Sequence, residues 1–345
     1  MKHLKQFFLL VFVIPAIPSS TFAQAGKDSL AAQKQSGTQD SIARKVLAYA
    51  NNKFALARPF NVEYTNMSPY RYASKLEGTS LPESKATRFS QLKLSTNFNL
   101  IRKKTWLLGA TIAYRYTDIG ANLVGPGSTA PKSVDGQFHY HASALNFTYF
   151  SKLFNKTTIY TGSLMVDGSE KHFERLTGLV TGTIILKANA RTKVAVGMVI
   201  SVDPSAQLPF IPTFTYEHKF NNGLIADMIL PKQLLLRKVI HKNGRLSLGT
   251  ELDRSGFYLY NLDPNNPSQK YEYRQVDLNN GLVYEHLIGS HFVATARTGI
   301  RATISSGIFE KEKKFGDAVF ETTPKPGFYF NIGLSYNPFI KKKTK

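Results

Sequence analysis

The chain has 345 residues and a formal net charge of +21, and 19% of its residues are charged while 12% are aromatic. Because a soluble globular protein carries about 25% charged residues, this composition argues against an ordinary soluble domain. The chain contains no Cys, which excludes disulfide bonds, a lipid-modified Cys and Cys-based metal or redox sites.

Residues 1 to 23 have the pattern of a cleavable secretory signal peptide. Lys2 and Lys5 make its start basic, an apolar stretch runs from Phe7 to Ile17, and the expected cut follows Ala23. This stretch is too short for a membrane-spanning helix, which needs about 20 apolar residues, and no later stretch reaches that length. We therefore predict an exported protein without a helical membrane anchor.

Residues 24 to 58 are expected to form an N-terminal periplasmic segment. The segment is polar at first, and then Asp40 or Ser41 is placed to cap a short helix with apolar residues at helical spacing from Ile42 to Tyr49. A short helix and a mobile tail both fit this pattern.

From residue 59 onward the chain alternates between apolar and polar residues in segments of about ten residues. In one such segment Trp106, Ile112 and Tyr116 share a face, while Arg115 and Thr117 lie on the opposite one. Strands of a membrane-spanning β-barrel alternate in this way, because one face meets lipid and the other meets the lumen.

Fourteen strands can be placed on this pattern. They lie near residues 59 to 66, 88 to 100, 105 to 118, 137 to 151, 157 to 166, 175 to 187, 192 to 202, 209 to 220, 223 to 230, 233 to 240, 245 to 260, 271 to 286, 291 to 304 and 326 to 338. Short and long connections alternate between them, as in bacterial barrels with short periplasmic turns. Reading residues 223 to 240 as one kinked strand would give thirteen strands, and other merges would give twelve.

The predicted fold class is therefore all-β: a closed, transmembrane, antiparallel up-and-down barrel over residues 59 to 339, followed by a basic tail at 340 to 345. Most of the positive charge falls in the short connections and in this tail. Such a basic rim can meet anionic lipid head groups, or simply prevent pairing between strand edges, and it does not form a groove for nucleic acid.

Charged residues on the inward-facing side of the predicted strands mark a candidate solute path. Aligning the strands at their turns places three pairs across neighbouring strands: Asp277 opposite Arg301, Glu217 opposite Asp227, and Arg237 diagonal to Glu251. With Asp253 and Arg297 these residues would form one charged inner sector, and Arg115 and Lys193 face the same lumen. The sector is either a polar passage or a salt-bridge network that fills a narrow lumen.

His139 and His141 share a face with Ser143, which raises the possibility of a metal site or a general base. The simpler interpretation is two polar lumen residues near the outer rim. We find no third ligand and no phosphate, zinc or nucleophile motif, and therefore predict no catalytic residue, no metal and no cofactor.

Four short stretches resemble outer-membrane β-barrel proteins of Bacteroidota, in particular an uncharacterised family among them. They are the TFAQ signal end, ARPFNVEYTN, DMILPKQLLLR and the closing PGFYFNIGLSYNPF. The resemblance implies insertion into outer-membrane lipid by the barrel assembly machinery, and it carries no activity for any residue. The closing stretch departs from the usual pattern, because IKKKTK follows Phe339, which is out of phase with Tyr336.

Three functions remain to be compared. The leading one is a channel or transporter that passes small solutes through the charged lumen. The second is a structural or interaction barrel with a plugged lumen, acting through outer loops such as 67 to 86 and 305 to 324. The third is an outer-membrane lipid hydrolase, which would need His139 or His141.

Overall fold

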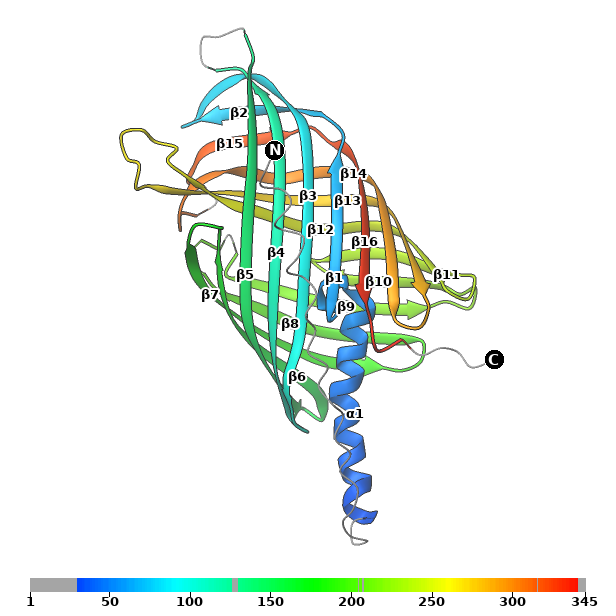
Figure 1. Ribbon diagram of the computed structural model, residues 1–345. Helices are drawn as coiled ribbons and strands as arrows, with labels where there is room; N and C mark the ends of the chain where they lie inside the picture. Colours follow the sequence, from blue (N-terminus) through cyan, green and yellow to red (C-terminus); the bar gives the residue numbers. More distant parts are fainter. Residues whose placement is uncertain (1–29, 126–129, 204, 207, 315, 341–345) are drawn as a thin grey trace, which may run out of the picture. The chain divides into compact units, whose positions relative to one another are not determined.

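A computed structural model describes residues 30–125, 130–203, 205–206, 208–314 and 316–340 (Figure 1). The chain divides into two compact units, 1–38 and 39–345. The described residues of the first unit belong to helix α1 (Leu30–Lys53), which continues into the second. The predicted signal peptide and residues 341–345 of the basic tail lie outside the described residues.

The second unit is built from antiparallel strands preceded by a short 3-10 helix, η1 (Ala55–Ala57). The strands are β1 (Phe60–Met67), β2 (Tyr70–Leu76), β3 (Thr79–Arg102), β4 (Trp106–Leu123), β5 (Lys132–Leu153), β6 (Lys156–Gly168), β7 (Phe173–Ala188), β8 (Thr192–Val202), β9 (Phe210–Lys219), β10 (Leu224–Leu230), β11 (Gln233–Ile240), β12 (Gly244–Tyr260), β13 (Lys270–Ile288), β14 (Phe292–Glu310), β15 (Ala318–Pro324) and β16 (Gly327–Tyr336). In the described part of the chain, no helix has the length and hydropathy that a membrane-spanning helix requires.

Fourteen strands close into a ring. Consecutive strands pair from β3 to β14, and the ring is completed by the pairings of β14 with β16, β16 with β1, and β1 with β3. Strands β2 and β15 extend β1 and β16 after a short break and pair with each other. The predicted barrel of fourteen strands is confirmed, and the Pro231 connection separates two distinct strands, β10 and β11.

The segments 67–86 and 305–324, which we expected to be long outer loops, are mostly strand. A tight turn at Glu77 and Gly78, with φ of 48° and 81°, joins β2 to β3, and β14 continues to Glu310. Polar residues are frequent in these extensions, so they lack the regular apolar alternation by which the other strands were recognised, although Tyr72 and Phe309 are buried. The prediction that these two segments are long loops was therefore wrong.

The wall of the barrel has apolar side chains outside and polar side chains inside. Ile112, Leu164 and Leu248 are each more than half exposed, whereas Gln91 and Gln275 are each 2% exposed. The alternation predicted for β4 is confirmed, since Ile112 faces outward and Thr117 is buried. In Figure 1, β3, β4 and β5 run side by side in front, with β12, β13 and β14 crossing behind them.

The predicted helix is present, but it begins at Leu30, so Asp40 and Ser41 lie within it rather than at its N-cap. Its later part packs Ala43 against Leu107 of β4 and Phe150 of β5. Leu107 lies next to the short connection between β3 and β4, and Phe150 lies near the short connection between β5 and β6. Residues 42–58, called the insert from here on, therefore contact the barrel wall from the inside at the end with the short connections.

Candidate functional site

The predicted inner sector is inside the barrel, but two of its three predicted pairings have the wrong register. Glu217 lies opposite Asp227, as predicted. Asp277 lies opposite Thr303 rather than Arg301, because the turn after β13 is centred on Ser290. The Asp277 and Arg301 side chains still meet diagonally, with Arg301 Nη1 3.8 Å from Asp277 Oδ2.

Arg237 also has a different partner from the one predicted. It lies opposite Ser247, while Gln233 faces Glu251, because the turn after β11 is centred one residue earlier than we placed it. The Nε of Arg237 is 2.6 Å from Oδ2 of Asp227. Arg237 therefore neutralises the carboxylate of the neighbouring strand β10 rather than Glu251.

Lys53, at the end of helix α1, inserts its side chain into the inner sector. Its Nζ lies 2.8 Å from Oδ1 of Asp227 and also forms an ion pair with Glu217, whose other oxygen is 2.5 Å from Lys193 Nζ. Burial lowers the pKa of the Lys53 amine, and the charge of Asp227 acts in the opposite direction. The insert thus brings a buried cation to two acidic residues that sequence analysis had paired only with each other.

Arg58, just after the insert's 3-10 helix, fastens the insert to distant strands and is 2% exposed. Its Nη1 donates to Ser335 Oγ of β16 at 2.6 Å, and its Nη2 donates to Glu285 Oε1 of β13 at 2.9 Å. Arg245 donates to the other oxygen of Glu285 at 2.7 Å and to Asn52 Oδ1 at 2.9 Å. The insert is therefore held by hydrogen bonds and ion pairs from β12, β13 and β16.

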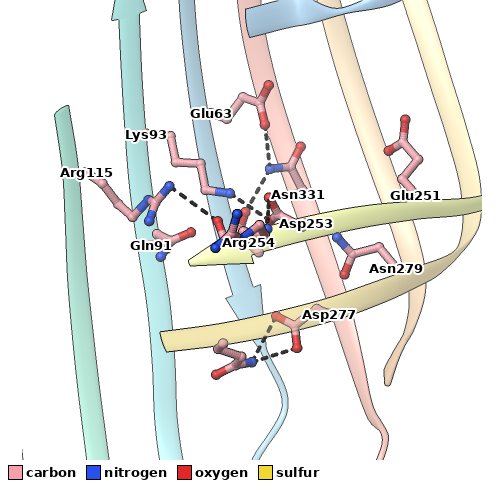
Figure 2. Close-up of polar contacts among 12 residues, drawn as sticks. Glu63, Gln91, Lys93, Arg115, Glu251, Asp253, Arg254, Asp277, Asn279 and Asn331 are labelled. Atoms are coloured by element: carbon pink, nitrogen blue, oxygen red, sulfur yellow. Dashed lines mark hydrogen bonds and ion pairs between the residues drawn. The ribbon is translucent and has the colours of Figure 1, made fainter. Parts of the chain in front are cut away.

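Beyond the insert, charged side chains cross the middle of the lumen (Figure 2). Lys93 of β3 reaches Asp253 of β12, with 2.7 Å between Nζ and Oδ2. Arg297 lies 3.2 Å from Glu63 and 3.5 Å from Glu251. A cavity of about 100 Å³ separates these pairs from the insert. The Lys93–Asp253 pair thus joins distant strands across the lumen, whereas Arg297 of β14 joins β1 and β12, each two strands away in the ring.

A larger cavity, of about 460 Å³, lies further from the short connections and is called the distal cavity. Its lining includes Arg115 of β4, Arg175 of β7 and Arg254 of β12. Next to it β5 and β12 approach each other across the interior, where the rings of Phe138 and Phe257 stack with centroids 3.9 Å apart. The lumen therefore contains a sizeable space that side chains do not fill.

His139 and His141 lie on the outer face of the barrel, so their predicted position in the lumen was wrong. Tyr114 OH is 2.8 Å from His139 Nδ1, and the ring of Tyr114 is 5.0 Å from that of His141. This face also carries Ile112. The error arises because a polar aromatic side chain at a lipid interface has the same sequence signature as one in a lumen. Among the described residues, no group of His, Asp or Glu is arranged to hold a metal ion.

Several candidate residues of the lumen were not predicted from the sequence. Asp167, in the distal cavity, follows the inward phase of β6 and could have been found from it, whereas Glu272 lines the same cavity in the opposite phase to Asp277 of β13. Lys53 and Arg58 could not have been found, because nothing in a helical or loop segment tells which strand it will contact.

No family model and no curated protein sequence matches this chain. Among solved structures, an outer membrane channel from Pseudomonas putida F1 has a TM-score of 0.33 and 9% identity, covering 81% of this chain and 95% of that one. The outer membrane protease OmpT from Escherichia coli has a TM-score of 0.28 and 11% identity, covering 81% and 96%. A Pseudomonas aeruginosa FadL homologue has a TM-score of 0.31 and 9% identity, covering 82% and 93%. These neighbours are outer-membrane β-barrels.

Proposed function

We propose that this protein is an outer-membrane β-barrel that passes small solutes through its charged lumen, and that the insert closes the end with the short connections. The observation that carries the membrane location is the outward apolar face. Burying such side chains in lipid is favourable by about 25 cal/mol per Å², and a closed barrel leaves no backbone group unpaired in lipid. The resemblance to Bacteroidota proteins and insertion by the barrel assembly machinery are part of this proposal.

The closure is supported by the contacts of the insert. Lys53 and Arg58 are nearly fully buried and bind carboxylates of three different strands, β9, β10 and β13. Removing one partner from a buried ion pair typically costs 3–5 kcal/mol, so the insert holds its place firmly. A solute would pass only when these contacts open.

Current measurements in planar lipid bilayers test the proposal. We expect the native chain to conduct rarely, whereas Arg58→Met, which removes the ties to Glu285 and Ser335, should open long-lived conducting states. Ala43→Trp is a second variant that leaves the lumen charges intact and crowds the contact with Leu107 and Phe150. Arg44→Trp is its matched control, because Arg44 is exposed on the same helix.

The folded state of each variant is checked by its resistance to SDS without heating. If both insert variants fold and still conduct no more than the control, solute passage is excluded. That outcome would favour the structural or interaction barrel, whose lumen is filled by the central ion pairs. The outer loops through which such an interaction barrel would act are shorter than we expected, since residues 67–86 and 305–324 are mainly strand.

The proposal assigns no enzymatic activity. A lipid hydrolase using His139 or His141 would need a nucleophile and an orienting group beside them, and the partners that the described residues place there are the Tyr114 and Tyr116 rings. A lipid hydrolase that uses His139 would lose activity in His139→Ala. Unchanged lipid hydrolysis in this variant would therefore exclude the use of His139.

A further inference from the structure

The distal cavity contains more basic than acidic side chains, and its acidic residues are already engaged. Asp167 Oδ2 accepts from Arg175 at 3.0 Å and from Tyr140 OH at 2.9 Å, and its Oδ1 accepts from Tyr258 OH at 2.6 Å. Arg175 also lies 3.3 Å from Glu272 and 3.7 Å from Asp203. One arginine thus satisfies the three carboxylates that line the cavity.

Two other arginines of the cavity have no such partner. The guanidinium of Arg115 reaches the carbonyl oxygens of Gly256 and Arg254 at 3.4 Å each, and its Nε is buried without a hydrogen-bond partner. Among the described residues, no carboxylate lies within ion-pair distance of Arg115 or Arg254. Arg254 and Arg175 both repel Arg274, which lines the same space.

A buried guanidinium nitrogen without a partner, such as Nε of Arg115, is costly unless a counter-charge or water reaches it. Walls of low dielectric constant strengthen the attraction between such a cation and an anion, and so raise the local concentration of anions. The volume of about 460 Å³ lies within the range of small-molecule sites. The rest of the lining offers apolar and aromatic surface, including Met165, Phe257 and Val276.

We infer that the distal cavity binds a small organic anion, with its charged group between Arg115 and Arg254 and its apolar part against the aromatic wall. This inference rests on the proposed role of the lumen as a solute path and names the class of solute. Carboxylate and phosphate groups share the chemistry that guanidinium recognises, since both accept paired N–H donors. Binding is measurable without passage, so the two proposals can fail separately.

Isothermal titration of the full chain in detergent tests the site with four probes of one shape: benzoate, phenyl phosphate, benzyl alcohol and benzylamine. We expect the two anions to bind at least tenfold more tightly than the alcohol, and the amine not to bind. The stronger of the two anions identifies the charged group. Equal binding of benzoate and benzyl alcohol, or no binding of either anion, would overturn the inference.

Arg115→Gln and Arg254→Gln should each weaken binding of the better anion by tenfold or more, because each removes a charge-assisted hydrogen bond to the anion. Arg71→Gln is the matched control: its side chain is 68% exposed and pairs with Glu83 in the extension of the barrel. Arg254 is exposed to the cavity and makes no ion pair among the described residues, so its variant should fold even if that of Arg115 does not. Unchanged affinity in Arg254→Gln would refute the assigned position of the charged group.

If the probes bind and the insert variants still do not conduct, the cavity is a binding site without a path. If the insert variants conduct and no anion binds, the path exists and its solute belongs to another class.

Discussion

Asp227 is the buried carboxylate on which two cations of the lumen depend. Lys53 lies 2.8 Å from one of its oxygens and Arg237 lies 2.6 Å from the other. Because Asp227→Asn would leave both cations short of a counter-charge, we expect it to lower the free energy of unfolding by about 3–5 kcal/mol. Urea titration in lipid vesicles, followed by the fluorescence of Trp106, the only Trp of the chain, measures this change.

The control for this prediction is Asp135→Asn. Asp135 pairs with Arg88 at 2.9 Å, but its side chain is 66% exposed, so solvent screens the interaction. Its unfolding midpoint should match that of the native chain. Equal shifts in the two variants would mean that burial does not set the strength of these ion pairs.

At the residue scale, the two-residue period assigned Arg115, Lys193, Glu217, Asp227 and Arg301 to the interior correctly. The pairings were less predictable, since they depend on the centre of each turn: a shift of one residue moves every partner by two. Hence the Glu217 and Asp227 pair was found while Arg237 was given to Glu251 instead of Asp227.

Strands β13 and β14 lie close together where Gly281 faces Gly299. A Cβ atom on Gly281 would lie 2.1 Å from the backbone oxygen of Thr298 and 2.8 Å from the Cα of Gly299. We therefore expect Gly281→Val to destabilise the barrel by about 3 kcal/mol or more, measured by the same urea titration. Gly162→Val should have little effect, because nothing lies within 4 Å of a Cβ added there. Similar losses in both variants would contradict this explanation.

At the scale of elements, apolar alternation located each of the fourteen strands of the ring. It did not locate the first part of β3 and the last part of β14, or strands β2 and β15, because polar residues interrupt the apolar alternation there. The helix was recognised from its spacing, but its start was not, since the polar residues before Asp40 carry no apolar period.

In the described part of the chain, the ring of strands has no free edge, because every strand from β3 to β14 and both β1 and β16 pair on two sides. We expect the native chain to run as a compact species on SDS gels without heating and as a slower one after heating. Deletion of β16 should abolish the compact species, because it leaves β1 and β14 with an unpaired edge. A compact species that survives this deletion would mean that the barrel closes differently.

The strand number and the closure were predictable at this scale because every long segment followed one period. The occupation of the lumen by the insert was not, because a helical pattern specifies an apolar stripe and not the surface that receives it.

The contacts of Arg58 also set the order of two steps in the assembly of the barrel. This residue precedes the first strand, yet its partner Ser335 lies 277 positions later, in the last strand. The hydrogen bond between Arg58 and Ser335 therefore cannot form until the last strand has been made, so its formation marks a completed ring of strands. The ion pairs of Lys53 with Glu217 and Asp227 need no residue of that strand, so the insert gains its full set of contacts only at the last step of assembly.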